Sequence, residues 1–262
     1  MTPQEFIDFV QADFDLTPAQ EEQFLACDAL YRDWNAKINV ISRKDIDGLY
    51  DHHVLHSLAI ARYLLTQPET LEKFRTADVL DLGTGGGFPG IPLAILFPEA
   101  RFTLCDSVGK KTIVAKAVAE ALGLKNVEVV NARAESLPKP FHFVVSRAVA
   151  SLPDFYPWVK GKFTDGILYL KGGDVVEEIA DVMARHRLRR GSVHTWPVSA
   201  WLHDAYYREC LGPWRGLMTD QGPVGPVFRK CLQGSGTVIF FLGDCGGGNS
   251  PRPTESQERE SC

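Results

Sequence analysis

The run Asp-Leu-Gly-Thr-Gly-Gly-Gly-Phe-Pro-Gly at residues 81–90 joins a carboxylate to a cluster of glycines. The apolar stretch 77–82 is typical of a buried strand, and glycines can adopt backbone angles that are closed to other residues. Pro89 is tolerated at the first position of a helix, and the apolar run behind it ends at Pro98. The stretch therefore predicts a strand, a glycine turn and a helix, a geometry that brings backbone N–H groups close to a ligand.

Two classes of cofactor use such a turn. A dinucleotide pattern Gly-x-Gly-x-x-Gly fits residues 85–90, with Asp106 at a suitable distance, but this register starts late after the strand. The pattern Asp81-x-Gly83-x-Gly85-x-Gly87 resembles the first motif of class I S-adenosylmethionine-dependent methyltransferases, in which the acid lies near the amino-acid end of the cofactor. A carboxylate can accept a hydrogen bond from an ammonium group, whereas it repels a pyrophosphate. The charge favours S-adenosylmethionine.

Three further candidates follow predicted strands. Asp106 ends the strand 102–106 and can accept hydrogen bonds from both hydroxyls of a ribose, or can cap a helix. Ala134 and Glu135 follow the strand 127–130, in a position to border an adenine ring, although Glu135 can equally be a solvated carboxylate at a helix start. Arg147 follows the strand 141–145 and is either a substrate clamp or a salt-bridge partner, with no acid adjacent to it in sequence.

The elements that position these residues alternate between strand and helix from Ala77 onward. We expect helices at 89–97, 113–124, 153–159 and 175–186, a fifth strand at 166–170, and two further strands near 193–198 and 237–242. Such alternation predicts an α/β fold with a mostly parallel, doubly wound, Rossmann-like sheet. Ligands of these sheets lie at the carboxyl ends of the strands, which is where the candidate residues fall.

The residues before Ala77 have a helical pattern. Helix starts are expected at Thr2-Pro3 and Thr17-Pro18, and a third helix is expected to carry Leu49 to Leu64. We divide the chain into an N-terminal helical cap (1–72), a methyltransferase domain (73–245) whose pattern is ambiguous beyond about 205, and a disordered, polar tail (246–262).

The composition bounds the class of protein. With 262 residues, 45% hydrophobic and 23% charged, the chain is typical of a globular protein. It has no apolar run of membrane-spanning length and no basic start followed by an apolar core, so we expect a cytoplasmic protein without a membrane partner. The six cysteines show neither CxxC pairs nor metal-ligand spacing, which predicts reduced thiols and no metal. A net charge of −5 is weak evidence against a nucleic-acid ligand but leaves room for a local basic patch.

Several motifs together resemble the RsmG family, also called glucose-inhibited division protein B. The resemblance covers roughly residues 20–185 and rests on Leu30-Tyr31-x-x-Trp34-Asn35-x-Lys37-Ile38-Asn39-Val40, His53-x-x-His56-Ser57-Leu58, Asp81 to Ala94, Asp106-Ser107-x-Gly109-Lys110-Lys111, Arg133-Ala134-Glu135 and Ser146-Arg147-Ala148. It implies a class I methyltransferase that transfers a methyl group from S-adenosylmethionine to N7 of a guanosine in 16S ribosomal RNA. It also implies cofactor contacts at Gly83, Phe88, Ala134, Glu135 and Arg147.

The chain departs from the family pattern at two places. His56 stands where many relatives have aspartate, and the segment from about residue 205 does not match the expected end of the family.

The chemistry of this reaction demands little of the protein. N7 of guanine carries a lone pair and no proton, so methyl transfer requires alignment rather than a general base, and we assign no catalytic residue. The chain lacks the Asp/Asn-Pro-Pro-aromatic run of exocyclic-amine methylation and the Pro-Cys of pyrimidine C5 methylation. A small-molecule methyltransferase and a non-catalytic binder of S-adenosylmethionine or RNA remain the alternatives.

Contacts to RNA are expected from basic residues. The candidates are Arg43, Lys44, Lys110, Lys111 and Arg147, and further candidates are Arg133 and Arg185 to Arg190. Basic pairs are also common on solvated faces. Phe88 or another aromatic residue could stack on the target base. The partner is then 16S ribosomal RNA or the small ribosomal subunit, and we expect the protein to be a monomer.

Overall fold

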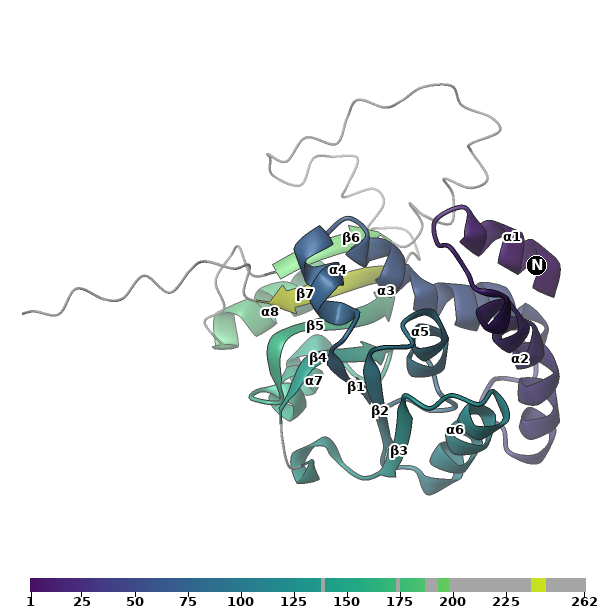
Figure 1. Ribbon diagram of the computed structural model, residues 1–262. Coiled ribbons are helices and arrows are strands. Elements are labelled where there is room, and N and C mark those ends of the chain that lie inside the picture. The colour runs from purple at the N-terminus through teal and green to yellow at the C-terminus, as the bar shows by residue number, and fades with distance from the viewer. Residues whose placement is uncertain (138–139, 173–174, 187–192, 198–236, 244–262) are drawn as a thin grey trace, which may run out of the picture.

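The computed structural model describes residues 1–137, 140–172, 175–186, 193–197 and 237–243. Seven strands form a single sheet in the order β3-β2-β1-β4-β5-β7-β6 (Figure 1). Their bounds are β1 Asp78–Leu82, β2 Arg101–Asp106, β3 Val127–Asn131, β4 Phe141–Arg147, β5 Phe163–Gly172, β6 Val193–Pro197 and β7 Thr237–Gly243. Strands β1 to β5 pair in parallel, whereas β7 runs antiparallel to β5 and β6. The expected doubly wound, mostly parallel sheet is therefore confirmed.

Helices cover both faces of this sheet. Their bounds are α1 Pro3–Gln11, α2 Pro18–Lys37, α3 His56–Leu64, α4 Pro68–Phe74, α5 Gly90–Leu96, α6 Gly109–Ala121, α7 Leu152–Val159 and α8 Val176–His186, with short turns η1 Ile46–Gly48, η2 Leu49–Leu55 and η3 Ala134–Ser136. Side chains alternate across a strand, so Val79 points to the face that α1 to α6 cover, and Leu80 points to the face that η3, α7 and α8 cover. Two hydrophobic clusters result, one on each side of the sheet.

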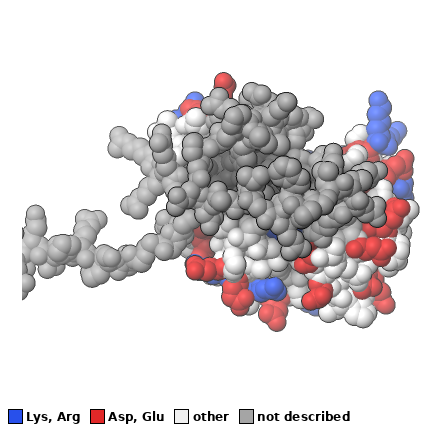
Figure 2. Space-filling view, turned by 90° about the horizontal axis from the view of Figure 1, so that it is seen from above, with Lys and Arg blue, Asp and Glu red and all other residues white. Residues whose placement is uncertain are grey.

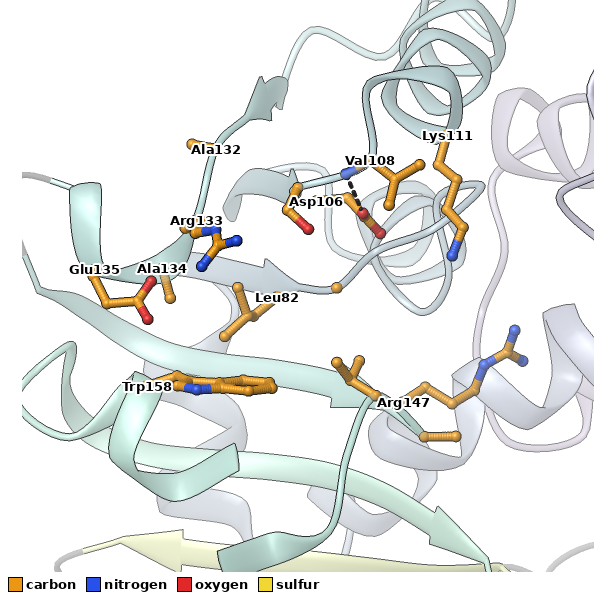
Figure 3. Close-up of a pocket in the computed structure, with 14 residues that line it drawn as sticks. Leu82, Asp106, Val108, Lys111, Ala132, Arg133, Ala134, Glu135, Arg147 and Trp158 are labelled. Atoms are coloured by element: carbon orange, nitrogen blue, oxygen red, sulfur yellow. Dashed lines mark hydrogen bonds between the residues drawn. The ribbon is translucent and has the colours of Figure 1, made fainter. Parts of the chain in front are cut away.

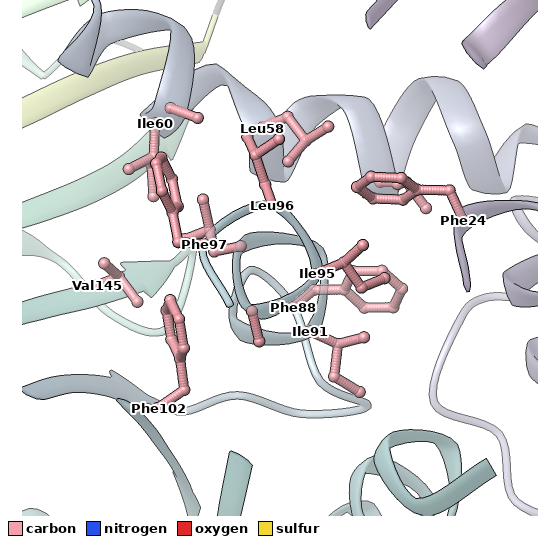
Figure 4. Packing of buried hydrophobic residues seen from close by; sticks show 14 of the residues in the cluster. Phe24, Leu58, Ile60, Phe88, Ile91, Ile95, Leu96, Phe97, Phe102 and Val145 are labelled. Carbon is pink, nitrogen blue, oxygen red and sulfur yellow. The ribbon is translucent and has the colours of Figure 1, made fainter. Parts of the chain in front are cut away.

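The larger cluster is centred on α5. Figure 4 shows Ile91 and Ile95 of this helix enclosed by Phe24 of α2, Leu58 of α3 and Phe102 of β2. These three neighbours come from three different elements, which fixes α5 and therefore the glycine turn directly before it. Burial of large apolar side chains of this kind contributes about 1.5–3 kcal/mol each relative to exposure.

The N-terminal helices begin where the sequence predicts. Thr2 caps α1 and Thr17 caps α2, each with its side-chain oxygen accepting from a backbone N–H three residues on, and each with a capping box completed by Glu5 or Gln20. The buried hydrophobic residues of α1 and α2 belong to the same cluster as α5. The division into a cap (1–72) and a methyltransferase domain stays a prediction, since the two parts share this core.

Several element boundaries differ from the expectation. The segment 49–64 is not one α-helix but the π-helical turn η2 followed by α3. Helix α4 was not expected because only Phe74 in it is buried, which leaves no apolar period to detect. Helix α6 starts at Gly109 rather than near Ile113, since its first turn is polar. Helix α5 starts at Gly90, with Pro89 at the N-cap.

The strands expected near 193–198 and 237–242 are confirmed as β6 and β7. The remaining residues of the segment from about 205, and the tail 246–262 that we expected to be disordered, lie outside the described residues.

Candidate active site

A cavity of about 560 Å³ lies at the carboxyl ends of β1, β2, β3 and β4, within the size range of small-molecule sites (Figure 3). It brings together the residues that follow each of these parallel strands, as expected for a doubly wound sheet. Helix α7 supplies one further wall. The lining residues are Leu82, Gly83, Asp106, Ser107, Val108, Lys111, Ala132, Arg133, Ala134, Glu135, Arg147, Ala148, Val149 and Trp158.

The glycine turn after β1 needs its glycines for two different reasons. Gly83 has φ of +72°, and a Cβ added to it would lie 2.4 Å from Cγ2 of Val149, so both its backbone angle and its surroundings exclude a side chain. Gly85 has φ of +58°, but a Cβ there would meet nothing within 4 Å. Gly83 therefore fits the wall of the cavity closely, whereas Gly85 leaves open space beside the turn.

Asp106 joins the ends of two strands and faces the cavity. Its Oδ2 accepts a hydrogen bond from the Gly85 amide at 2.9 Å, and its Oδ1 accepts one from the Val108 amide at 2.8 Å. The capping alternative is not realised, because Val108 is the N-cap of α6 and no side chain caps this helix. Each carboxylate oxygen can accept a further hydrogen bond, and Asp106 lines the cavity, so it retains the capacity to bind the two hydroxyls of a ribose.

Asp81 lies beneath the glycine turn, with no exposed surface. Its Oδ2 accepts from the Thr84 hydroxyl at 2.6 Å and from the Gly90 amide at 2.8 Å. Its Oδ1 is buried and has no hydrogen-bond partner among the described residues. Burial raises the pKa of Asp81 to about 7, so neutral pH lies close to its titration. Asp81 is not among the residues that line the cavity.

Phe88 is also buried rather than exposed to the cavity. Only 4% of it is accessible. Its ring centroid lies 4.7 Å from that of Tyr31 and 5.3 Å from that of His53, and the guanidinium carbon of Arg147 stands 5.2 Å from the ring centroid. The aromatic neighbours and the arginine cover the ring, which leaves no face for a stacked base in this structure. The predicted cofactor contact of Phe88 stays a prediction.

Ala134 and Glu135 form the side of the cavity at β3, where the sequence predicts an adenine ring. Both belong to the turn η3; Ala134 is buried and Glu135 is exposed, so Glu135 is at once a cavity residue and a solvated carboxylate. Figure 3 shows the Trp158 indole on the opposite wall, across from Glu135 and Leu82. Trp158 was not predicted as a site residue. It was missed because its neighbours on α7, such as Phe155 and Val159, are core residues, and a tryptophan among them suggests packing.

Arg147 contacts the segment before α3 and pairs with no carboxylate among the described residues. Its Nη1 donates to the carbonyl oxygen of His52 at 3.1 Å, and its Nη2 lies 2.9 Å from Nδ1 of His53. Nε2 of His53 in turn lies 2.7 Å from Oδ2 of Asp45. The salt-bridge alternative is thus not realised directly, and an acid reaches Arg147 only through a histidine.

The basic residues predicted to contact RNA lie in three places. Lys111 and Arg133 line the cavity, and Lys110 is exposed beside Lys111 on α6. Arg43 and Lys44 are exposed in the loop that Asp45 links to His53. Figure 2 shows one face of the molecule, on which acidic side chains are spread widely and basic ones are few.

Two further features of the described part of the chain bear on the class of site. No group of three or more His, Cys, Asp or Glu side chains within it is arranged to hold a metal ion. No helix there is long and apolar enough to cross a membrane.

Comparison with known proteins gives the family. The family model described as rRNA small subunit methyltransferase G matches residues 20–200. The protein named Ribosomal RNA small subunit methyltransferase G of Flavobacterium psychrophilum is 58% identical over 176 residues, which cover 64% of this chain and 80% of that protein. Proteins of the same name from Flavobacterium johnsoniae and Bacteroides thetaiotaomicron are 54% and 55% identical, covering 64% and 63% of this chain and 81% and 80% of theirs. The chain belongs to the rRNA small subunit methyltransferase G family.

Proposed function

We propose that this protein transfers a methyl group from S-adenosylmethionine to N7 of a guanosine in bacterial 16S ribosomal RNA. The observation that carries the proposal is the cavity that joins Gly83, Asp106, Glu135 and Arg147 at the carboxyl ends of four parallel strands, in a chain of this family. The family supports the reaction and the RNA. The choice of N7 is supported by the motifs named above and by the modest chemical demands of that atom.

The described residues fit S-adenosylmethionine. When bound, this cofactor supplies a methyl group carried on a positively charged sulfur. The buried Oδ1 of Asp81 has no hydrogen-bond partner among the described residues, and when ionised it offers negative charge beneath the glycine turn. The open space at Gly85 admits a ligand beside the backbone, and Asp106 can accept from ribose hydroxyls. Glu135 and Trp158 form two walls that suit a planar base with an exocyclic amine.

For transfer to N7, alignment is the contribution expected from the protein. Holding two reactants in a reactive geometry lowers the barrier by up to about 7–11 kcal/mol without any proton transfer. Arg147 ends β4 at the rim of the cavity, with donors left over after its contacts to His52 and His53. We assign it to the cofactor, the guanine or a neighbouring phosphate.

Lys111 and Arg133 at the same cavity are suited to bind phosphates of the RNA backbone. Together with Arg43, Lys44 and Lys110 they make up the RNA-contacting residues of this proposal. With ribosomal RNA as substrate, the protein acts in the bacterial cytoplasm. We also propose that residues 73–245 form the methyltransferase domain, behind a helical cap of residues 1–72.

The test is methyl transfer to its natural target. Purified protein is incubated with labelled S-adenosylmethionine and small ribosomal subunits that lack the modification, and the label is located by nuclease digestion. We expect the label on N7 of one guanosine. Label on another atom would contradict the N7 assignment, and cofactor binding without label would favour a small-molecule enzyme or a non-catalytic binder.

Paired variants make this assay specific to the site. Arg147→Ala should reduce transfer at least tenfold, since it removes a charged hydrogen-bond donor from the cavity rim. Arg101→Ala is the matched control, because Arg101 is exposed at the other end of the sheet and makes a surface ion pair with Asp78. Equal activities of the two variants would remove Arg147 from the proposal.

A further inference from the structure

Asp45, His53 and Arg147 form a continuous chain of hydrogen bonds from the loop before η1 to the end of β4. The atoms are Oδ2 of Asp45 and Nε2 of His53 at 2.7 Å, then Nδ1 of His53 and Nη2 of Arg147 at 2.9 Å. Only 13% of the His53 side chain is accessible, so water competes little for these contacts. Asp45 precedes His53 by only eight residues, whereas Arg147 lies 94 residues beyond His53, and η2 brings His53 to both.

The chemistry of the partners determines the protonation of His53. A carboxylate accepts hydrogen bonds, so Nε2 of His53 must carry the proton that it shares with Asp45. A guanidinium only donates, so Nδ1 of His53 must be the unprotonated acceptor for Arg147. Both contacts can form together only in the neutral Nε2–H tautomer.

The surroundings support the same protonation state. Burial, and after it the charge of Arg147, lower the pKa of His53, while Asp45 opposes this shift. The charged or titratable groups around the ring are Asp45 from the loop, His52 and His56 from its own segment, and Arg147 from β4. The pKa of His56 is lowered to about 3, chiefly by burial, so this neighbour adds no positive charge near neutral pH.

The segment η2 also holds Arg147 from a second direction. The carbonyl oxygen of His52 accepts from Nη1 of Arg147, and the guanidinium carbon lies over the Phe88 ring. His52 donates its Nδ1–H to the other oxygen of Asp45, so Asp45 fixes two consecutive residues of η2. Two donors of the guanidinium, and its position over the Phe88 ring, are therefore fixed by groups that do not line the cavity themselves.

We propose that Asp45 and His53 are positioning residues that hold Arg147 for its ligand: Asp45 fixes the neutral Nε2–H tautomer of His53, and His53 orients the guanidinium at the cavity rim. The proposal rests on the proposed function to the extent that Arg147 contacts cofactor or RNA. It adds that this contact depends on an acid–histidine pair outside the cavity, in which His53 is largely shielded from water. The pair also anchors the Arg43-Lys44 loop, which directly precedes Asp45, to the rim.

The tautomer is tested without any assumption about the reaction. Histidine ring ¹⁵N spectra of the full-length protein at pH 7.5, assigned with a His53→Asn variant, should show Nε2 of His53 protonated and Nδ1 unprotonated. In Asp45→Ala the share of the Nε2–H tautomer should fall, because only the contact with Arg147 then favours it. Asp47→Ala is the matched control, because Asp47 is an exposed acid two residues on that pairs with Arg32 and not with His53. A doubly protonated ring, an Nδ1–H tautomer, or no response to Asp45→Ala would overturn the proposal.

Function is tested by a double-variant cycle on cofactor affinity, RNA affinity and methyl transfer. Of these three quantities, His53→Ala should reduce about tenfold each one that Arg147→Ala reduces. In the Arg147→Ala background, adding His53→Ala should cause no further reduction. His53→Asn should retain more activity than His53→Ala, since its side-chain oxygen can accept from the guanidinium in place of Nδ1. A purely structural role would give additive losses and equal loss of melting temperature in both His53 variants, which would contradict the proposal.

The two sets of results separate the two proposals. If Arg147→Ala changes neither binding nor transfer, the role of Arg147 in the proposed function fails, whereas the tautomer spectra still decide whether Asp45 and His53 hold it. If the spectra disagree while Arg147→Ala is inactive, the positioning proposal fails alone.

Discussion

The amide of Gly85 donates a hydrogen bond to the carboxylate of Asp106 across 2.9 Å, and this contact joins the glycine turn after β1 to the end of β2. The other oxygen of the same carboxylate accepts from the amide of Val108, at the start of α6. One side chain thereby fixes the two loops that form the floor of the cavity. Its contribution to ligand binding and its contribution to the shape of the site are therefore coupled, and variants of Asp106 separate them.

Asp106→Asn should weaken S-adenosylmethionine binding by at least tenfold and should lose less stability than Asp106→Ala. The amide oxygen can keep one backbone contact, but the side chain loses its charge and one acceptor. Asp106→Ala should lose the same affinity and in addition about 1–3 kcal/mol of unfolding free energy, because two backbone N–H groups lose their acceptor. Calorimetry and urea unfolding measure the two effects. Glu120→Ala, an exposed acid on α6, is the control, and equal affinities of Asp106→Asn and wild type would exclude the ribose contact.

The glycine turn predicts different costs for two similar substitutions. Gly83→Ala combines a left-handed backbone angle with a 2.4 Å approach to Val149, whereas Gly85→Ala has the angle alone. We expect Gly85→Ala to lose about 1–2 kcal/mol of unfolding free energy and Gly83→Ala clearly more. Urea unfolding of both variants tests the order. Equal losses would mean that Val149 moves aside freely and that the wall of the cavity is not tightly packed at this point.

The fold and much of the cavity follow from local sequence patterns. Strand and helix alternation predicts the parallel sheet, and Asp106, Glu135 and Arg147 meet because each follows a parallel strand. The burial of Asp81 and Phe88 could not be read in this way. Both residues belong to the motif of the turn, but the backbone of that turn folds over Asp81, and His53 and Tyr31 come from distant segments to cover Phe88.

Contacts between segments are the other part that sequence reasoning misses. The link from Asp45 to His53 depends on the π-helical geometry of η2, whereas the sequence there predicts an ordinary helix. Trp158 stands among core residues in the sequence of α7. Only the placement of this helix shows that its indole lines the cavity.

Asp81 should make stability fall as pH rises toward neutrality. Its pKa is raised to about 7 in the folded protein, so between the unfolded value near 3.8 and about 7 the folded state binds the extra proton. The contribution of Asp81 is then fully present below pH 3.8 and is lost as pH rises through 7. Buried His56 acts in the opposite sense, because its pKa is lowered to about 3 and its contribution is lost as pH falls below 6.5.

The difference between wild type and Asp81→Asn isolates the carboxyl group. Urea unfolding at pH 5, 6, 7 and 8 should show wild type losing stability relative to Asp81→Asn as pH rises. In the wild type, the affinity for S-adenosylmethionine should rise over the same range, because a cationic ligand favours the ionised acid. A pH-independent difference in stability would mean that Asp81 titrates far below 7.

Ala148 is the non-glycine residue with positive φ among the described residues, at +48°, and it directly follows Arg147. Ala148→Gly removes a strain of about 1–2 kcal/mol and adds back about 0.5–1 kcal/mol of backbone entropy, so stability should stay equal or rise slightly. Ala148→Val should be destabilised by about 1–2 kcal/mol or more, since β-branched residues are poorly tolerated there. Ala150→Gly is the control and should lose stability. A clear loss of stability in Ala148→Gly would contradict the backbone strain assigned to Ala148.

Trp158 provides an optical test of where the base of the cofactor binds. Trp158 is 37% exposed and its side chain lies across the cavity from Glu135, so a planar ligand on that wall should change the tryptophan emission. Titration with S-adenosylmethionine or its demethylated product should quench the wild-type fluorescence. Trp158→Phe should keep the fold, weaken binding by about threefold to tenfold through the smaller ring, and abolish most of the quenching. Trp34→Phe, which alters a tryptophan on α2, is the matched control and should leave the quenching by the ligand intact. If Trp34→Phe removed the quenching and Trp158→Phe did not, the base would lie away from α7. The wall formed by Ala134 and Glu135 would then have to bind the base without an aromatic partner.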